Sequence, residues 1–145
     1  MIHRVATLAD IPLLAALNLQ LIRDEGHRNR MNEAELAARM QGWLASGEYI
    51  AVLFEDAGAV VAYALYRQQS VEIYLRQLYV VPQRRRQGVG RHVMQVLRDH
   101  IWPPDRRLTL EVLAANTRAL AFYRALGYVD YAVTMEIMPP SSAAF

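Results

Sequence analysis

The sequence predicts an α/β fold in which one mixed sheet carries helices on its faces. The chain has 145 residues, which suits one domain large enough to bury a core. No internal repeat, low-complexity segment or linker divides it. Apolar residues alternate with a period of two in some segments and recur at helical spacing in others. The resulting order of elements is β-α-α-β-β-β-α-β-α-β.

The N-terminal part of the chain predicts one short strand and two helices. Ile2–Val5 is a strand candidate, and Asp10–Glu25 is a helix whose first residue can act as the N-cap. Asn32 and Glu35 form a capping-box pattern, which predicts the start of a second helix. We expect Gly47 to end that helix, because glycine suits the position after a helix.

The middle of the chain predicts three strands and a helix. Tyr49–Phe54 and Val60–Tyr66 flank the turn signal Asp56–Gly58, which is typical of a hairpin. Val71–Val81 predicts a third and longer strand. Gly88–Ile101 carries apolar residues at helical spacing and predicts a helix.

The C-terminal part predicts a strand, a helix and a last strand. These elements are Leu108–Leu113, Thr117–Leu126 and Val129–Ile137. We expect residues 1–138 to form the domain and 139–145 to form a loose tail.

Composition excludes several kinds of site. The chain has no cysteine, so disulfides, thiolate nucleophiles and thiolate metal sites are absent. The four histidines lack metal-ligand spacing, so no metal is expected. No signal peptide and no apolar run of membrane-spanning length is visible, which predicts a cytoplasmic protein without a membrane partner. The net charge of +2 is too small to indicate nucleic-acid binding, but six arginines fall between Arg76 and Arg98, which suggests a local anion site.

The long strand changes its inward face partway along. Val71, Ile73 and Leu75 alternate on odd positions, whereas Leu78 and Val80 alternate on even ones. One extra residue near position 76 or 77 would absorb the slip as a β-bulge and free a backbone N–H, which could act as an oxyanion donor. A strand buried on both faces would explain the pattern equally well.

The segment Val80–Arg91 follows a strand and opens a helix. Gly88 and Gly90 lack Cβ atoms, so a ligand can approach the backbone closely. The first amides of the helix are unpaired and, with the helix dipole, form an anion site. Three arginines add positive charge there: Arg85, Arg86 and Arg91. A diphosphate is the natural occupant.

Other interpretations of this turn are weaker. It lacks the Gly-Lys-Ser/Thr of a P-loop and the third glycine of a dinucleotide-binding turn. No stacking aromatics interleave the arginines, which argues against a nucleic-acid site. A solvated arginine-rich turn stays open as the structural alternative.

The stretch Leu78–Arg91 resembles motif A of the GCN5-related N-acetyltransferase (GNAT) family, in the form Arg85-Arg-Gln-Gly88-Val-Gly90. The resemblance implies a mostly antiparallel sheet with a bulged, splayed central strand and a loop that wraps the pyrophosphate of acetyl-CoA. By position, Leu78 would offer an N–H to the acetyl group, and the next residues would line the pantetheine arm. The implied cofactor-binding residues of this stretch are Leu78, Tyr79, Val80, Val81, Arg85, Arg86, Gln87, Gly88, Val89, Gly90 and Arg91.

The segment from Asn116 to Tyr128 resembles motif B of the same family. Asn116 and Tyr123 are seven residues apart, nearly two helical turns, so both project from one face. The resemblance implies that Asn116 contacts the pantetheine and that Tyr123 lies near the thioester sulfur. Asn116 is also a good helix cap, and Tyr123 could be a core aromatic.

The implied reaction is attack of a primary amine on the thioester of acetyl-CoA. Neutralising a lysine-like amine at pH 7 costs roughly 4–5 kcal/mol, so a base or desolvation must assist. A tyrosine stays protonated at pH 7, so we assign Tyr123 as the general acid. Where some family members have a glutamate on the bulged strand, this chain has Tyr74. Glu72 is the first candidate for the base and Glu111 the second.

Two further expectations complete the prediction. Asp24, Glu25 and His27 lie in the loop that covers the acceptor site in this family, where they could attract a cationic amine. The resemblance also makes a homodimer an expectation. A non-catalytic acyl-CoA-binding or sensor module is the main alternative to the enzyme, because the strand glutamate is missing.

Overall fold

The computed structural model describes residues 1–140, in which a five-stranded sheet has the order β1-β2-β3-β4-β5. The predicted loose tail at 139–145 therefore lies largely outside the described residues. Neighbouring strands are antiparallel, except that β5 runs parallel to β4. The strands are β1 Ile2–Val5, β2 Ile50–Asp56, β3 Ala59–Gln68, β4 Glu72–Val80 and β5 Arg107–Leu110. The predicted mixed α/β architecture is confirmed.

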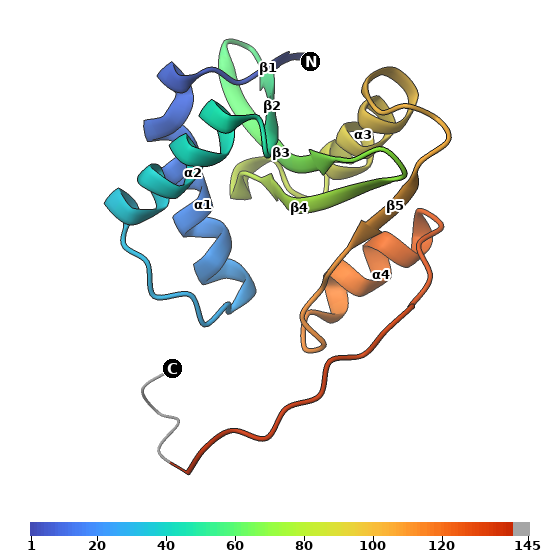
Figure 1. Cartoon of the computed structure of the whole chain (residues 1–145). Helices are drawn as coiled ribbons and strands as arrows, with labels where there is room; N and C mark the ends of the chain where they lie inside the picture. The colour runs from blue at the N-terminus through green and yellow to red at the C-terminus, as the bar shows by residue number, and fades with distance from the viewer. Residues whose placement is uncertain (141–145) are drawn as a thin grey trace.

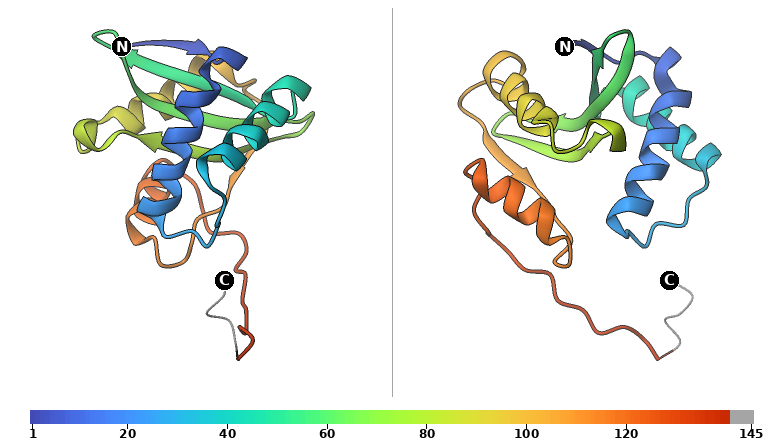
Figure 2. Two further views of the ribbon diagram at one scale, coloured as in Figure 1. Left: turned by 90° about the vertical axis from the view of Figure 1, so that its left-hand side faces the viewer. Right: turned by 180° about the vertical axis from the view of Figure 1, so that it is seen from behind.

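Helices cover both faces of this sheet (Figures 1 and 2). The helices are α1 Ile11–Glu25, α2 Glu33–Ser46, α3 Val89–Val96 and α4 Thr117–Ala125. The apolar faces of α1 and α2 pack on one side of the sheet, around the fully buried Tyr63. The apolar face of α3 packs on the other side, around the fully buried Phe54. We call the first side the α1/α2 face. None of the described helices is long and apolar enough to cross a bilayer.

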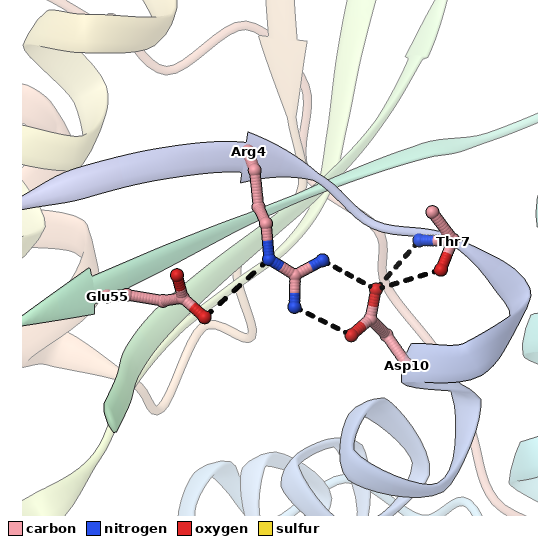
Figure 3. Close-up of polar contacts among 4 residues, drawn as sticks. All are labelled: Arg4, Thr7, Asp10 and Glu55. Atoms are coloured by element: carbon pink, nitrogen blue, oxygen red, sulfur yellow. Dashed lines mark hydrogen bonds and ion pairs between the residues drawn. The ribbon is translucent and has the colours of Figure 1, made fainter. Parts of the chain in front are cut away.

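A charged contact near the N-terminus fixes the start of α1 to the sheet (Figure 3). The guanidinium of Arg4 donates two hydrogen bonds to Asp10, at 2.9 and 2.8 Å. Its Nε lies 3.6 Å from the carboxylate of Glu55 on β2. Asp10 also accepts from the backbone N–H of Thr7 at 2.8 Å. The hydrogen bond from Arg4 is the main reason that the pKa of Asp10 falls to about 2.

The predicted start and end of α2 are confirmed. The backbone N–H of Glu35 donates to Asn32 at 2.8 Å, and the backbone N–H of Asn32 donates to the Glu35 carboxylate at 2.9 Å. Gly47 ends the helix with a φ of 78°, in the left-handed region that glycine adopts without strain.

The long strand β4 carries the bulge that its sequence suggested. Leu65 of β3 faces Gln77, but the next residue of β3 faces Leu75, so Arg76 is the extra residue. Ile73 and Leu75 pack on the α3 side, and after the bulge Leu78 packs there instead. The extra residue therefore absorbs the change of parity.

The predicted last strand at Val129–Ile137 is wrong, because these residues form no strand. The segment has an alternating pattern but joins no ladder of the sheet, which ends at β5. Its odd-numbered apolar side chains are 76–99% exposed: Val129, Tyr131, Val133, Met135 and Ile137. A strand exists only through hydrogen bonds to a neighbour, and this segment has none along the described chain.

Candidate active site

The strands β4 and β5 separate after a short region of contact. Their ladder joins Glu72–Leu75 to Arg107–Leu110 and then stops, so the second half of β4 pairs with β3 alone. The backbone N–H of Val81 donates to Val61 at 2.9 Å, which shows which positions of β4 face β3. Because the bonding direction alternates along a strand, the N–H of Leu78 points to the open side, where no strand lies.

The turn after β4 leads directly into α3. Pro82–Arg84 form a single 3₁₀ turn, and α3 begins after Gly88, whose φ is 78°. Arg86 has a φ of 62°, a left-handed conformation that costs a non-glycine residue roughly 1–2 kcal/mol. Strained backbone of this kind concentrates at ligand-binding turns. The first amides of α3 consequently sit beside the open edge of β4.

Two of the arginines in this turn are occupied by the protein itself. Arg85 donates from Nε to the carbonyl of Val80 at 2.9 Å and from Nη2 to Asp24 at 2.7 Å. Arg84 lies 2.8 Å from the carboxylate of Asp56. The geometry therefore gives Arg85 a bracing role between the turn and the end of α1, whereas the sequence suggested a direct phosphate contact.

The two other arginines are free to meet a ligand. Arg86 and Arg91 have no ion pair or hydrogen bond within residues 1–140. Gln87 receives a hydrogen bond from Arg84 at 3.1 Å and donates to the Gln83 carbonyl at 3.1 Å, which closes the turn on itself. Positive charge available to an anion thus comes from Arg86, Arg91 and the amides of the helix.

Gly90 allows α3 to approach α4. A Cβ atom at this position would lie 3.3 Å from Cζ of Phe122. This spacing is tighter than ordinary van der Waals contact, so a side chain here would push against the ring. The second glycine of the motif is therefore explained by helix packing, and the first by the positive φ at Gly88.

Helix α4 presents the two residues of the second motif. The side-chain oxygen of Asn116 accepts from the backbone N–H of Ala119 at 3.2 Å, so Asn116 caps the helix and keeps its amide N–H₂ for another partner. The ring of Tyr123 lies between those of Phe122 and Tyr128, at 5.0 and 5.6 Å. Its hydroxyl makes no hydrogen bond to the described residues. Burial, then Glu25 and Tyr128, raise the pKa of Tyr123 well above 10, so the hydroxyl stays protonated.

The end of α1 supplies carboxylate charge to the same region. The negative charge of Glu25 raises the pKa of both Tyr63 and Tyr123, after burial as the larger cause. His27 Nε2 lies 2.8 Å from Oε1 of Glu25. The end of α1 therefore holds a carboxylate and an imidazole in contact with each other.

A buried polar chain, which the sequence did not reveal, supports the bulge. Gln77 donates from Nε2 to Asn18 Oδ1 at 2.7 Å, and the Tyr63 hydroxyl donates to Gln77 Oε1 at 2.8 Å. Asn18 lies within the apolar stripe of α1, and Gln77 directly follows the bulge residue Arg76. The sequence signal for this chain was a polar residue within an otherwise apolar pattern, Asn18 in α1 and Gln77 in β4.

The carboxylates proposed as bases are engaged elsewhere. Glu72 lies 2.7 Å from Arg107, and six residues of strand, about 20 Å, separate it from Leu78. Glu111 accepts a hydrogen bond from the Tyr74 hydroxyl at 3.0 Å. Burial and this contact raise the pKa of Tyr74 to about 12. The geometry gives no support to Glu72 as the base.

No cluster of metal-binding side chains occurs within residues 1–140. One surface hollow lies beside Met1 and Gly58, and another lies beside Trp102 and Arg106. Both lie away from Leu78 and Tyr123. The candidate site is therefore defined by the open edge of β4, the turn that follows it, and the facing ends of α1 and α4.

Comparisons with known proteins agree with this fold. The acetyltransferase (GNAT) family model matches residues 17–128. A solved mutant of the BH1408 protein from Bacillus halodurans shares 27% identity, with a TM-score of 0.77 over 94% of this chain and 98% of that one. No curated protein matches the sequence.

More distant structures share the fold. One is a predicted acetyltransferase with acetyl-CoA from Clostridium acetobutylicum, at 18% identity and a TM-score of 0.73 over 94% of each chain. Another is the aminoglycoside N-acetyltransferase AAC(6')-Iy in complex with CoA, at 15% identity and a TM-score of 0.74 over 96% of this chain and 94% of that one.

Proposed function

Because the chain belongs to the acetyltransferase (GNAT) family, we propose that it transfers an acetyl group from acetyl-CoA to a primary amine. The observation that carries this proposal is the open edge of β4 at Leu78, on the strand that leads through the turn into α3. A donor molecule laid along this edge would have its phosphates at the turn and its thioester at the splay between the strands. No metal is part of the proposal.

The acetyl-CoA molecule would be held mainly by backbone groups. The amides at the start of α3, with Arg86 and Arg91, would bind the pyrophosphate. Residues 79–81 would line the pantetheine arm, and the Asn116 amide would donate to it. The N–H of Leu78 would bond the thioester carbonyl and stabilise the oxyanion that forms on attack.

Tyr123 would act on the leaving group. The amine nitrogen forms a bond to the carbonyl carbon, the carbon–sulfur bond breaks, and the sulfur leaves with the electron pair. The Tyr123 hydroxyl donates a hydrogen bond to that sulfur. A raised pKa favours hydrogen-bond donation over complete loss of the proton. In the net balance, the amine loses one proton and the CoA thiol gains one.

The acceptor side would be completed by the loop after α1. The Glu25 carboxylate, which contacts His27 and raises the pKa of Tyr123, would accept the proton that the amine loses. We place this pair in the role first given to Glu72. A free thiol product suits a reducing compartment, which keeps the cytoplasm as the expected location.

The experiment that tests the function is release of free thiol from acetyl-CoA in the presence of a panel of amines. Calorimetric titration with CoA accompanies it. Binding with transfer to at least one amine supports the enzyme. Binding without any transfer supports the non-catalytic acyl-CoA-binding alternative, which the absence of a glutamate at Tyr74 favours. Absence of binding rules out both.

A further inference from the structure

Three arginines from different elements stack on aromatic rings at the edge of the α1/α2 face. We call Arg39, Arg67 and Arg76 the arginine cluster. Arg39 of α2 and Arg76 of the β4 bulge hold their guanidinium carbons 4.5 and 4.6 Å from the ring of Trp43. The same indole thus lies against two cations.

The third arginine extends this row towards β5. Arg67 of β3 lies 5.5 Å from the ring of Tyr49 and 5.4 Å from that of Tyr74. Arg76 lies 5.7 Å from the same Tyr49 ring. Tyr49 is 3% exposed, so the rings hold the guanidinium groups in place from the protein side.

The arginine cluster has no counter-charge of its own. No carboxylate within residues 1–140 forms an ion pair with any of the three. The Nε atoms of Arg39 and Arg67 are buried without a hydrogen-bond partner. Of the three, only Arg76 makes a hydrogen bond to a residue in the described part of the chain, the Tyr49 hydroxyl at 3.4 Å. Ring faces attract cations but do not accept hydrogen bonds from N–H groups that point past the ring, so these guanidinium N–H groups lack an acceptor.

The cluster lies close to the proposed reaction centre. Arg76 precedes Leu78 by two residues, which is about 7 Å along a strand. Tyr74 shares the α1/α2 face with Tyr79 on the same strand. An anionic group bound here and an amine at the acetyl carbonyl could belong to one small molecule or to one peptide terminus.

We propose that the amine acceptor also carries a carboxylate, which the arginine cluster binds while the amine reaches the acetyl group at Leu78. This inference rests on the proposed acetyl transfer. Guanidinium groups bind carboxylates through paired N–H donors, and the rings would fix their orientation. A polycationic acceptor such as an aminoglycoside would instead meet three like charges.

The test uses acceptor pairs that differ only in a remote charge. Short peptides with a free α-amine are compared with a C-terminal carboxylate and with a C-terminal amide. We expect the carboxylate form to have at least a tenfold higher kcat/KM. Arg76→Gln and Arg67→Gln should each reduce this ratio towards one. Arg106→Gln, which removes the same charge outside the cluster, should leave it unchanged.

A second measurement separates this inference from the proposed function. If no peptide is acetylated, glutarate is titrated while the fluorescence of Trp43 is followed in a Trp102→Phe background. A saturable change that Arg76→Gln abolishes supports the anion site. Equal use of the two peptide forms, a ratio that survives both cluster substitutions, or the lack of any fluorescence change overturns it.

Discussion

Removing the hydroxyl of Tyr123 should slow acetyl transfer without weakening the binding of CoA. In Tyr123→Phe the ring keeps its positions against Phe122 and Tyr128, at 5.0 and 5.6 Å. The lost interaction is one hydrogen bond to a sulfur that becomes charged, worth about 1.5–3 kcal/mol. At 1.4 kcal/mol for each factor of ten, kcat should fall by about 10- to 150-fold.

The control and the refutation come from the neighbouring tyrosine. The Tyr128 hydroxyl is buried without a partner, so Tyr128→Phe removes an unsatisfied group and should leave turnover unchanged. Thiol release under saturating acetyl-CoA measures kcat, and calorimetry measures the Kd for CoA. If Tyr123→Phe turns over within twofold of the wild type while it binds CoA normally, the hydroxyl has no role in the reaction.

Three further predictions concern the turn, two helical glycines and the N-terminal contact. Arg86→Gln should weaken CoA binding about tenfold in calorimetry, which corresponds to the loss of roughly one charge-assisted hydrogen bond. Arg85→Gln should mainly lower Tm, because Arg85 bonds Val80 and Asp24. Equal effects of the two substitutions on CoA binding would contradict this division. Gly42→Ala, with open space around it, should gain up to about 1 kcal/mol of stability in denaturant unfolding, whereas Gly90→Ala should gain nothing or lose stability, because its Cβ would meet Phe122 at 3.3 Å. Asp10→Asn should destabilise the protein at pH 7, because the native pKa of Asp10 is depressed to about 2. The stabilisation that the ionised Asp10 contributes is present above its unfolded pKa of about 4 and is lost as pH falls through about 2. A difference in unfolding free energy between the wild type and Asp10→Asn that is equal at pH 7 and pH 2 would contradict this prediction.

Local sequence patterns predicted most of the fold because local chemistry decides those elements. The capping pair Asn32 and Glu35 set the start of α2 through their own side chains. The change of parity in β4 followed from burial on alternate faces, and the extra residue is Arg76. Both signals depend on neighbours in the chain, which a single sequence contains.

Contacts with partners that are distant in sequence could not be predicted from the motifs. Arg85 was assigned to phosphate from its position in the motif, but Asp24 lies beside it only after folding. Glu72 was the nearest carboxylate along the strand, yet Arg107 pairs with it and Leu78 is out of its reach. The segment 129–137 has the period of a strand, but period cannot supply the neighbour that a strand requires.

The short ladder between β4 and β5 has a thermodynamic consequence for the donor. Within residues 1–140, the ladder between these two strands has four residue pairs. A molecule that bonds β4 on one side and Asn116 on the other would link the two reversibly. At a concentration of 100 times Kd, such a molecule raises the free energy of unfolding by about 2.7 kcal/mol. Cellular levels of the cofactor would then set how firmly this half of the molecule is attached, and therefore its resistance to proteolysis.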